Sequence, residues 1–333
     1  GLIIALIDHC PAAHYYPGGS AGGTLKTMTD DQRENQIAIL EDGTQLSFAE
    51  HGDPSGRPEM FFHGWPSSRF QGWLLDDAGK EMGLRIVSPD RPGIGESTFV
   101  PDRKLLDWPP LAAKFADYLC WDRFSVMALS GGGPYVLACA NEIPGRLEKA
   151  GIIAGAPPVR QLPDKSKLAL PYRVLTRVNG GPAWLMKSAL NIMHWSAHLN
   201  ARSPMLKACE VMVPKSDRRA VSNPEQRQRM FQNYQRAFDQ GNEQVRTDGQ
   251  IYLSDWGFRL QDVHHHIDWW HGEKDRNIFI DTARWVASQL PDCLLRCLEG
   301  EGHFSISSTR AAEIVRELFG EAGWTAESTR SRD

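Results

Sequence analysis

Short apolar runs alternate with helical patterns along much of the chain. Runs of about four to eight apolar or alternating residues, bounded by Gly, Pro, Asn or Asp, are typical of buried strands. Such runs predict strands over residues 37–40, 45–50, 58–62, 84–88, 124–129, 149–154, 267–270 and 293–298. Helical patterns predict helices over residues 105–119, 134–140, 280–289 and 309–318. Together they predict an α/β fold, with a mostly parallel sheet flanked by helices and led by an antiparallel hairpin.

The pattern changes between about residues 158 and 262, where helical periodicity replaces the strand signal. Helices are predicted over residues 168–178, 182–199, 204–213 and 225–240. Asn223-Pro224 is a start signal for the last of them. Because strands resume at residue 267, this block is an insertion in one α/β domain. We expect a helical cap over the carboxyl ends of the strands, where ligands bind in such sheets.

The chain therefore divides into an N-terminal segment (1–32), a core (33–157 and 263–325) and the cap (158–262). The first ten residues, GLIIALIDHC, are apolar but have no basic region before them, and Asp8 interrupts them. They predict neither a membrane span nor a signal peptide. An arm packed on the body or on a partner chain and a disordered leader are both open for residues 1–32.

Residues 124–140, FSVMALSGGGPYVLACA, carry the strongest chemical signal. A buried strand runs directly into Ser130, three glycines follow, and Pro134 opens a helix. This is the context of a nucleophile elbow, in which small residues flank the serine two positions away. Those positions hold Ala128, in place of the usual glycine, and Gly132. The alternative is a glycine-rich loop that binds phosphate or merely turns the chain.

A serine hydroxyl needs a histidine to take its proton and a carboxylate to orient that histidine. Asp275 and His303 each follow a predicted strand across a short turn. The chain order Ser130, Asp275, His303 is the order used when such a triad is built on an elbow. These three residues are the candidate catalytic triad.

Composition narrows the functional classes. The chain has 333 residues, 41% of them hydrophobic, which is ample for a large core. The formal net charge is −4, so no nucleic-acid partner is expected. The six cysteines show no CxxC pair and no metal-ligand spacing, which predicts reduced thiols and a cytoplasmic location. No dinucleotide fingerprint or metal cluster is present, so we expect no cofactor and no metal.

Five motifs resemble the α/β-hydrolase fold superfamily, in its capped branch with proline iminopeptidase-like and epoxide-hydrolase-like serine hydrolases. They cover about residues 36–320 and are specific for the fold rather than for a substrate. They are His63-Gly64-Trp65-Pro66, Asp90-Arg91-Pro92-Gly93-Ile94-Gly95-Glu96-Ser97, Ser130-Gly131-Gly132-Gly133, His271-Gly272-Glu273-Lys274-Asp275 and Gly302-His303.

The resemblance implies Ser130 as nucleophile, Asp275 as orienting acid and His303 as base. It also implies an oxyanion hole made by the backbone N–H groups of Trp65 and Gly131. Glu273 competes for the acid role, but it points to the other side of an extended segment.

Several neighbouring residues have structural interpretations. The resemblance implies that His63 shapes the oxyanion loop, and Asp90 and Arg91 are expected to pin their loop. Three consecutive histidines at 264–266 suggest a metal site. Neighbours on an extended segment alternate faces, however, so they cannot easily converge on one ion.

The cap is expected to set the substrate. We predict Trp184, Trp195, Tyr234 and Tyr252 as substrate-binding residues, with Met193, Met230 and Phe231 as further lining or core residues. An aromatic-lined cap indicates a small apolar substrate.

The resemblance implies a serine hydrolase that cleaves an ester, thioester, lactone or related acyl bond through an acyl-enzyme. C–C bond hydrolysis of a β-diketone type and amidase or aminopeptidase action share the same triad. Trp65-Pro66 stands where the peptidase branch carries glycines, which disfavours a peptidase. Epoxide hydrolases use an aspartate where this chain has Ser130. Catalysis without hydrolysis is also open, because the same pocket can activate other nucleophiles.

From another class, the chain could be a non-catalytic hydrolase-like binder of a small apolar molecule. A small-molecule substrate is the expected partner, and a homodimer is left open.

Overall fold

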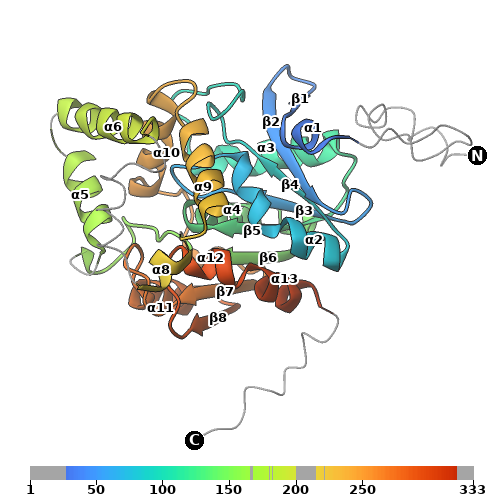
Figure 1. Cartoon of the computed structure of the whole chain (residues 1–333). Helices are drawn as coiled ribbons and strands as arrows, with labels where there is room; N and C mark the ends of the chain where they lie inside the picture. Colours follow the sequence, from blue (N-terminus) through green and yellow to red (C-terminus); the bar gives the residue numbers. More distant parts are fainter. Residues whose placement is uncertain are drawn as a thin grey trace, which may run out of the picture.

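The computed structural model describes residues 28–165, 168–179, 181, 183–199, 215–220 and 222–320. The sheet in this part of the chain has eight strands in the order β1-β2-β4-β3-β5-β6-β7-β8 (Figure 1). The strands are β1 (Gln36–Ile39), β2 (Gln45–Gly52), β3 (Arg57–Phe62), β4 (Leu84–Pro89), β5 (Phe124–Leu129), β6 (Leu147–Ile153), β7 (Ile267–Gly272) and β8 (Cys293–Leu298). β2 pairs antiparallel with β1 and β4, and the pairs from β4 to β8 are parallel. The predicted α/β fold, with its leading hairpin, is confirmed.

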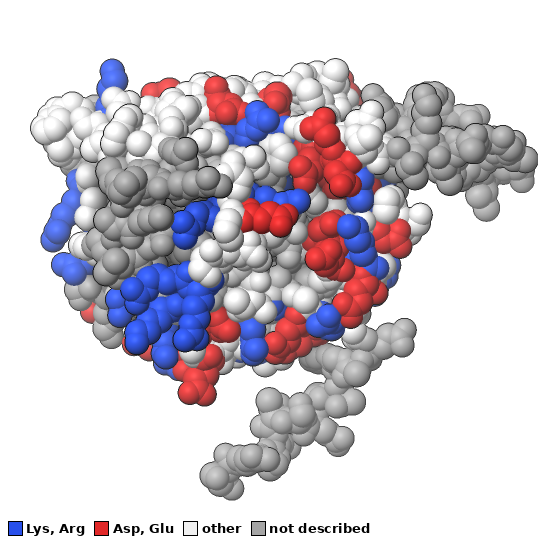
Figure 2. Space-filling model, viewed as in Figure 1, with Lys and Arg blue, Asp and Glu red and all other residues white. Residues whose placement is uncertain are grey.

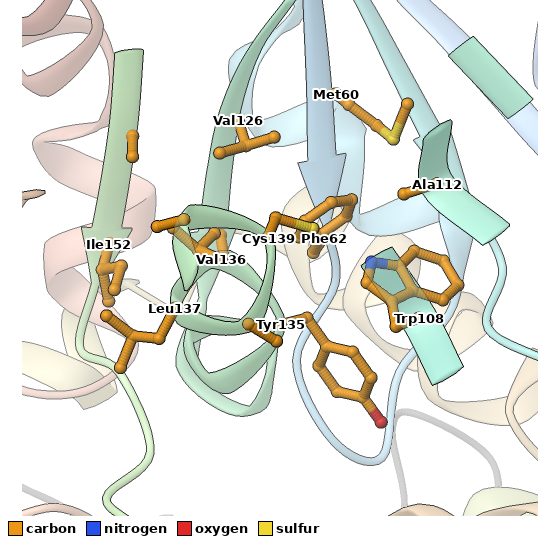
Figure 3. Close-up of a cluster of buried hydrophobic side chains, with 14 of the residues drawn as sticks. Met60, Phe62, Trp108, Ala112, Val126, Tyr135, Val136, Leu137, Cys139 and Ile152 are labelled. Carbon is orange, nitrogen blue, oxygen red and sulfur yellow. The ribbon is translucent and has the colours of Figure 1, made fainter. Parts of the chain in front are cut away.

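Two sets of helices cover the two faces of the sheet. They are α3 (Trp108–Tyr118), α4 (Gly133–Glu142) and α11 (Ile280–Gln289) on one face, and α2 (Asp76–Met82) and α13 (Ala311–Phe319) on the other. Neighbouring strand residues divide between them, as the alternation of a strand requires. Phe62 and Val126 lie in the first cluster (Figure 3), and Phe61 and Met127 lie in the second.

Short 3-10 helices fill several of the connections. They are η3 (Arg69–Leu75), η4 (Leu105–Asp107), η5 (Ser130–Gly132), η6 (Pro144–Arg146) and η8 (Leu260–Asp262). η5 is the turn that joins β5 to α4, so the candidate nucleophile opens a helix at the carboxyl end of a central strand.

The inserted segment between β6 and β7 is helical where the structure describes it. Its helices are α5 (Leu170–Asn179), α6 (Ala183–Ala197), α8 (Lys215–Ala220), α9 (Pro224–Arg236) and α10 (Glu243–Leu253). α6, α9 and α10 share a small apolar cluster that includes Met186, Leu190, Phe238 and Val245. α8 packs instead against α12 (Ser305–Thr309), beside the core (Figure 1). We propose that this helical segment is the cap expected over residues 158–262.

The predicted helix over 204–213 and most of the N-terminal segment lie outside the described residues. Within that segment, α1 (Asp30–Glu34) begins after Thr29, whose side chain accepts a hydrogen bond from the Gln32 backbone N–H. The pattern missed α10, because its buried face carries polar residues such as Gln244 and Asp248.

The cysteines are only partly as predicted. Cys139, Cys293 and Cys297 are free thiols. Cys120 is disulfide-bonded, which corrects the expectation of reduced thiols and removes the cysteine argument for a cytoplasmic location. Within the described ranges, none of the helices combines the length and apolarity needed to cross a membrane.

Candidate active site

Ser130 lies at a sharp turn between β5 and α4. Its φ of +53° is in the left-handed region, which is uncommon for a residue with a side chain and recurs at functional turns. A Cβ on Gly132 would collide with the Phe62 carbonyl oxygen and would lie 2.9 Å from the Ala128 Cβ. Gly132 must therefore be glycine, whereas alanine fits at position 128. Alanine at position 128, in place of the usual glycine, is therefore compatible with the turn.

The three candidate catalytic side chains meet at the carboxyl edge of the sheet. His303 Nε2 lies 3.0 Å from Ser130 Oγ, and His303 Nδ1 lies 2.7 Å from Asp275 Oδ2. Asp275 Oδ1 accepts hydrogen bonds from the backbone N–H groups of Asn277 (2.7 Å) and Ile278 (2.8 Å). With the proton on Nδ1, the imidazole can accept the serine proton at Nε2.

His303 and Asp275 each favour the charged form of the other. Burial alone lowers the pKa of His303, but the Asp275 carboxylate outweighs burial and raises this pKa above its usual value. Burial alone raises the pKa of Asp275, but His303 brings it below its usual value. Asp275 is therefore favoured as a carboxylate, and it can stabilise the imidazolium that forms when His303 takes a proton.

Asp217, in α8, fixes the loop that carries His303. Its carboxylate accepts hydrogen bonds from the backbone N–H groups of His303 (3.2 Å), Phe304 (2.9 Å) and Ser305 (2.9 Å). Asp217 is 2% exposed. The local sequence did not predict this role, because an aspartate in a short charged helix, KSDRRA, is typical of a solvated surface residue.

The loop after β3 brings the Trp65 backbone nitrogen close to Gly131, the residue after Ser130. A Cβ on Gly131 would lie 3.0 Å from the Trp65 nitrogen, so the two backbones approach closely. No hydrogen bond of the Trp65 amide is found among the described residues, and the Gly131 amide lies in the first turn of η5, which lacks intrahelical acceptors. Two amide donors therefore lie beside the serine without a partner in the described chain.

Arg91 holds this loop from behind. Its guanidinium donates to the carbonyl oxygens of His63 (2.6 Å) and Gly64 (2.6 Å), and to Asp248 Oδ2 (2.7 Å) in α10. Asp248 also pairs with Arg103. Burial alone raises the pKa of Asp248, but the two arginines bring it well below its usual value. Arg91 thus pins the loop after β3, and a buried ion network ties that loop to the inserted helices.

His63 and Asp90 have structural surroundings. His63 is fully buried, and its Nδ1 lies 3.0 Å from the Gly64 carbonyl oxygen. Asp90 pairs with Arg69 at 2.6 Å. Both therefore shape the loops around the site. Glu273, the competitor of Asp275, is exposed.

An apolar cavity of about 460 Å³ opens onto these groups. It is lined by Trp65, Pro66, Ser130, Gly131, Tyr172, Val174, Val178, Ala189, Met193, Tyr234, Tyr252, Asn277, Ile278, His303 and Phe304. Two of the four predicted substrate-binding residues, Tyr234 and Tyr252, are among them. A ligand in this cavity would touch both the serine and the inserted helices.

Trp184 and Trp195 do not line the cavity, contrary to the prediction. They are 64% and 57% exposed on α6. Helical spacing turns Ala189 and Met193 toward the cavity, and Met186 and Leu190 toward the apolar cluster of the inserted helices. It leaves the two tryptophans on the outer face of α6. Aromatic content alone could not distinguish these faces.

The residues that suggested a metal lie apart from the site. His266 Nδ1 lies 2.7 Å from Asp292 Oδ1, near the start of β7. Among the described residues, no group of three or more His, Cys, Asp or Glu side chains is placed to hold a metal ion.

Charged side chains of both signs are interspersed over much of the face in Figure 2. Basic side chains gather where α8 and α11 lie in this view. A hollow is lined by the basic residues Lys215, Arg219, Lys274 and Arg276, together with the carboxylates of Glu273 and Asp275. The overall net charge did not predict this local cluster, because it averages over the surface.

Comparison with known proteins assigns the family. Residues 60–317 match the alpha/beta hydrolase family, and the chain belongs to it. A non-heme haloperoxidase of Rhodococcus erythropolis is 32% identical over 146 residues, which cover 41% of this chain and 50% of that protein. A non-heme chloroperoxidase of Streptomyces lividans is 29% identical over 150 residues, 40% of this chain and 49% of that protein. The chain thus spans about half the length of the curated relatives it matches.

Solved structures agree with the fold. A bromoperoxidase from Bacillus anthracis superposes with a TM-score of 0.66 at 18% identity, over 86% of this chain and 99% of that chain. An esterase from Exiguobacterium antarcticum gives a TM-score of 0.60 at 19% identity, over 84% of this chain and 96% of that chain. Family membership confirms the predicted superfamily and supports a hydrolase role.

Proposed function

We propose that this protein is a serine hydrolase that cleaves an ester, thioester, lactone or related acyl bond of a small apolar substrate. One observation carries the proposal. Ser130 Oγ, His303 and Asp275 are linked by hydrogen bonds of 3.0 and 2.7 Å at one end of an apolar cavity. A serine beside a histidine that a buried carboxylate orients is the arrangement needed for acyl transfer.

In the proposed reaction, Ser130 Oγ attacks the acyl carbon while His303 Nε2 takes the hydroxyl proton. The carbonyl oxygen becomes an oxyanion, which the backbone N–H groups of Trp65 and Gly131 stabilise by hydrogen bonds. The intermediate collapses, His303 returns the proton to the leaving group, and an acyl-serine remains. Water then attacks the ester with His303 again as base, which releases the acid and restores Ser130.

The cavity favours a substrate with an apolar acyl group. Away from the serine, its wall includes Val174, Val178, Ala189 and Met193. A charged acyl group would lose its hydration there without gaining a partner from these side chains. We therefore expect uncharged acyl groups of moderate size to be preferred.

The relatives favour a second candidate reaction. Two are named non-heme haloperoxidase and non-heme chloroperoxidase. In this chain, hydrogen peroxide in place of water could open the acyl-serine and release a peroxy acid with Ser130 restored. This candidate uses the same serine, histidine and aspartate.

The proposal is tested by the hydrolysis of p-nitrophenyl esters of graded chain length, measured with wild type and Ser130→Ala. Activity that falls by about 10⁴-fold or more in folded Ser130→Ala supports the serine mechanism. Retained activity in that variant would contradict it. Matched anilides and β-diketones distinguish amidase and C–C bond hydrolase action. Stoichiometric release of product without turnover would favour the binder.

A further inference from the structure

The hydroxyl of Tyr252 has no partner in the described chain. Tyr252 is in α10 and is 1% exposed, and its hydroxyl oxygen is buried without a hydrogen bond among the described residues. Two other tyrosine hydroxyls have partners: Tyr135 donates to Asp248 at 3.0 Å, and the half-buried Tyr234 donates to the Met193 carbonyl oxygen at 3.1 Å. A buried polar group without a partner is uncommon and needs an explanation.

This hydroxyl lies beside the two unpaired amides. Tyr252 lines the cavity together with Trp65, Ser130 and Gly131. A Cβ on Gly131 would lie 2.7 Å from the Tyr252 hydroxyl oxygen and 3.0 Å from the Trp65 backbone nitrogen. The hydroxyl and the Trp65 amide therefore both lie close to Gly131, where an added side chain would collide with them.

The tyrosine is held in this place by the buried network. Tyr252 follows Asp248 by one helical turn, so both face the core from α10. Asp248 is fixed by Arg91, which also holds the carbonyl oxygens of the Trp65 loop. Trp65 packs edge-on against the Tyr252 ring, with 6.0 Å between ring centroids, and its indole N–H donates to the Val245 carbonyl oxygen.

The hydroxyl remains a donor over the working pH range. Burial raises the pKa of Tyr252 well above its usual value of 10, and Arg91 only partly opposes this effect. The neutral phenol therefore keeps its proton and can donate it in a hydrogen bond.

We propose that the Tyr252 hydroxyl is a third donor to the oxyanion that forms when Ser130 attacks its substrate. This inference rests on the proposed serine hydrolase function and extends it to a catalytic side chain from the inserted helices. A donor without a partner in the free enzyme gains one only as the negative charge develops. Such a contact stabilises the transition state more than the bound substrate.

Tyr252→Phe tests the proposal, because it removes one oxygen and keeps the ring. We expect kcat for p-nitrophenyl esters to fall about 100-fold, with KM within about two-fold of wild type. A trifluoromethyl ketone, which forms a tetrahedral adduct with a serine, should bind the variant about 100-fold more weakly. The thermal midpoint should be unchanged or higher, because the lost hydroxyl had no partner.

Tyr118→Phe is the matched control. Tyr118 lies in α3, where its ring stacks on Phe115, and it does not line the cavity. We expect kcat and inhibitor affinity within about two-fold of wild type, a narrow range compared with the loss of an oxyanion donor. An equal loss in both variants would reveal a general effect of removing a tyrosine hydroxyl and would overturn the inference.

Several outcomes would overturn the role of Tyr252. They are a kcat within two-fold of wild type in Tyr252→Phe, a raised KM with unchanged kcat, and a marked loss of thermal stability. A crystal structure of the wild-type adduct decides independently of folding. We expect the hydroxyl within about 3 Å of the adduct oxygen, and a longer distance excludes the bond.

The Ser130→Ala variant separates this inference from the function on which it rests. If Ser130→Ala stays active, the serine mechanism fails and the oxyanion role falls with it. If Ser130→Ala is inactive while Tyr252→Phe is normal, only the inference about Tyr252 fails.

Discussion

Asp275 and Asp248 are both buried aspartates, but they belong to different regions of the molecule. Asp275 follows β7 at the edge of the sheet, where it meets His303 and two backbone amides. Asp248 lies in the inserted helix α10 and pairs with Arg91, which is 157 residues away in sequence. The sheet edge positions its groups by strand ends and short turns. The inserted helices reach the site through buried long-range ion pairs.

This difference determines where the largest effects of substitution are expected. In the proposed mechanism, groups at the sheet edge take part in proton transfer, so their loss should affect the reaction rate with little change in stability. Buried charges of the inserted helices hold loops in place, so their loss should affect stability first and rate through position.

Asp275→Asn should have the largest effect of the substitutions compared here. The amide removes the charge that stabilises an imidazolium, and it can favour the wrong histidine tautomer. We expect kcat to fall by about 10⁴-fold, measured with p-nitrophenyl esters. Glu273→Gln is the control, and because Glu273 is exposed it should leave kcat unchanged. Similar losses in the two variants would contradict the assignment of Asp275.

Asp248→Ala should be the most destabilising change in the inserted helices. It leaves Arg91 and Arg103 buried without their carboxylate, which costs about 3–5 kcal/mol of unfolding free energy. Denaturant unfolding measures this loss. The exposed Arg259–Asp262 pair provides the comparison, and Asp262→Ala should change stability little. Equal losses of unfolding free energy in Asp248→Ala and Asp262→Ala would show that the buried network contributes no more to stability than an exposed ion pair.

Asp217→Ala should act on the histidine loop. Three backbone N–H groups lose their acceptor, which destabilises the folded state by about 3 kcal/mol and loosens His303. We expect kcat to fall about 10- to 100-fold, because small displacements of a catalytic group are costly. Ester hydrolysis and denaturant unfolding, measured on the same sample, test both expected effects. A rate equal to wild type would show that the loop is positioned without Asp217.

The pH profile should reflect the pairing at the sheet edge. The mechanism requires neutral His303, so kcat/KM should rise with pH through the pKa of this residue. Because Asp275 raises that pKa, the midpoint should lie above about 6.5, the usual value for histidine. Asp275→Asn should move the midpoint to lower pH. If Asp275→Asn has the same midpoint as wild type, a group other than the His303–Asp275 pair controls the fall of kcat/KM at low pH.

The outer face of α6 should give the smallest effect. Trp184 and Trp195 are exposed and do not line the cavity. Trp184→Ser and Trp195→Ser should therefore leave kcat/KM for every ester within about two-fold of wild type, as expected for surface changes. A changed chain-length preference would place these side chains on the path of the substrate after all.

The sequence predicted the sheet, the residues at its edge and two of the three tyrosines that line the cavity. Strand ends are predictable because period-two apolar runs and glycine turns fix them locally, as they do for Ser130 and His303. Asp217 and Asp248 were missed for a physical reason. Their burial depends on partners distant in sequence, and a polar residue with such a partner has the same local pattern as an exposed one. The prediction for Trp184 and Trp195 was wrong for a related reason, because composition does not show which face of a helix a residue occupies.

The central claim is that Ser130 is activated by His303, and one measurement tests it most directly. The purified protein is treated with a fluorophosphonate probe, and the adduct is located by peptide mass spectrometry. The account predicts labelling at Ser130 that is lost in His303→Ala and retained in Glu273→Gln. A folded protein that is not labelled at Ser130, or that is labelled equally without His303, would contradict it.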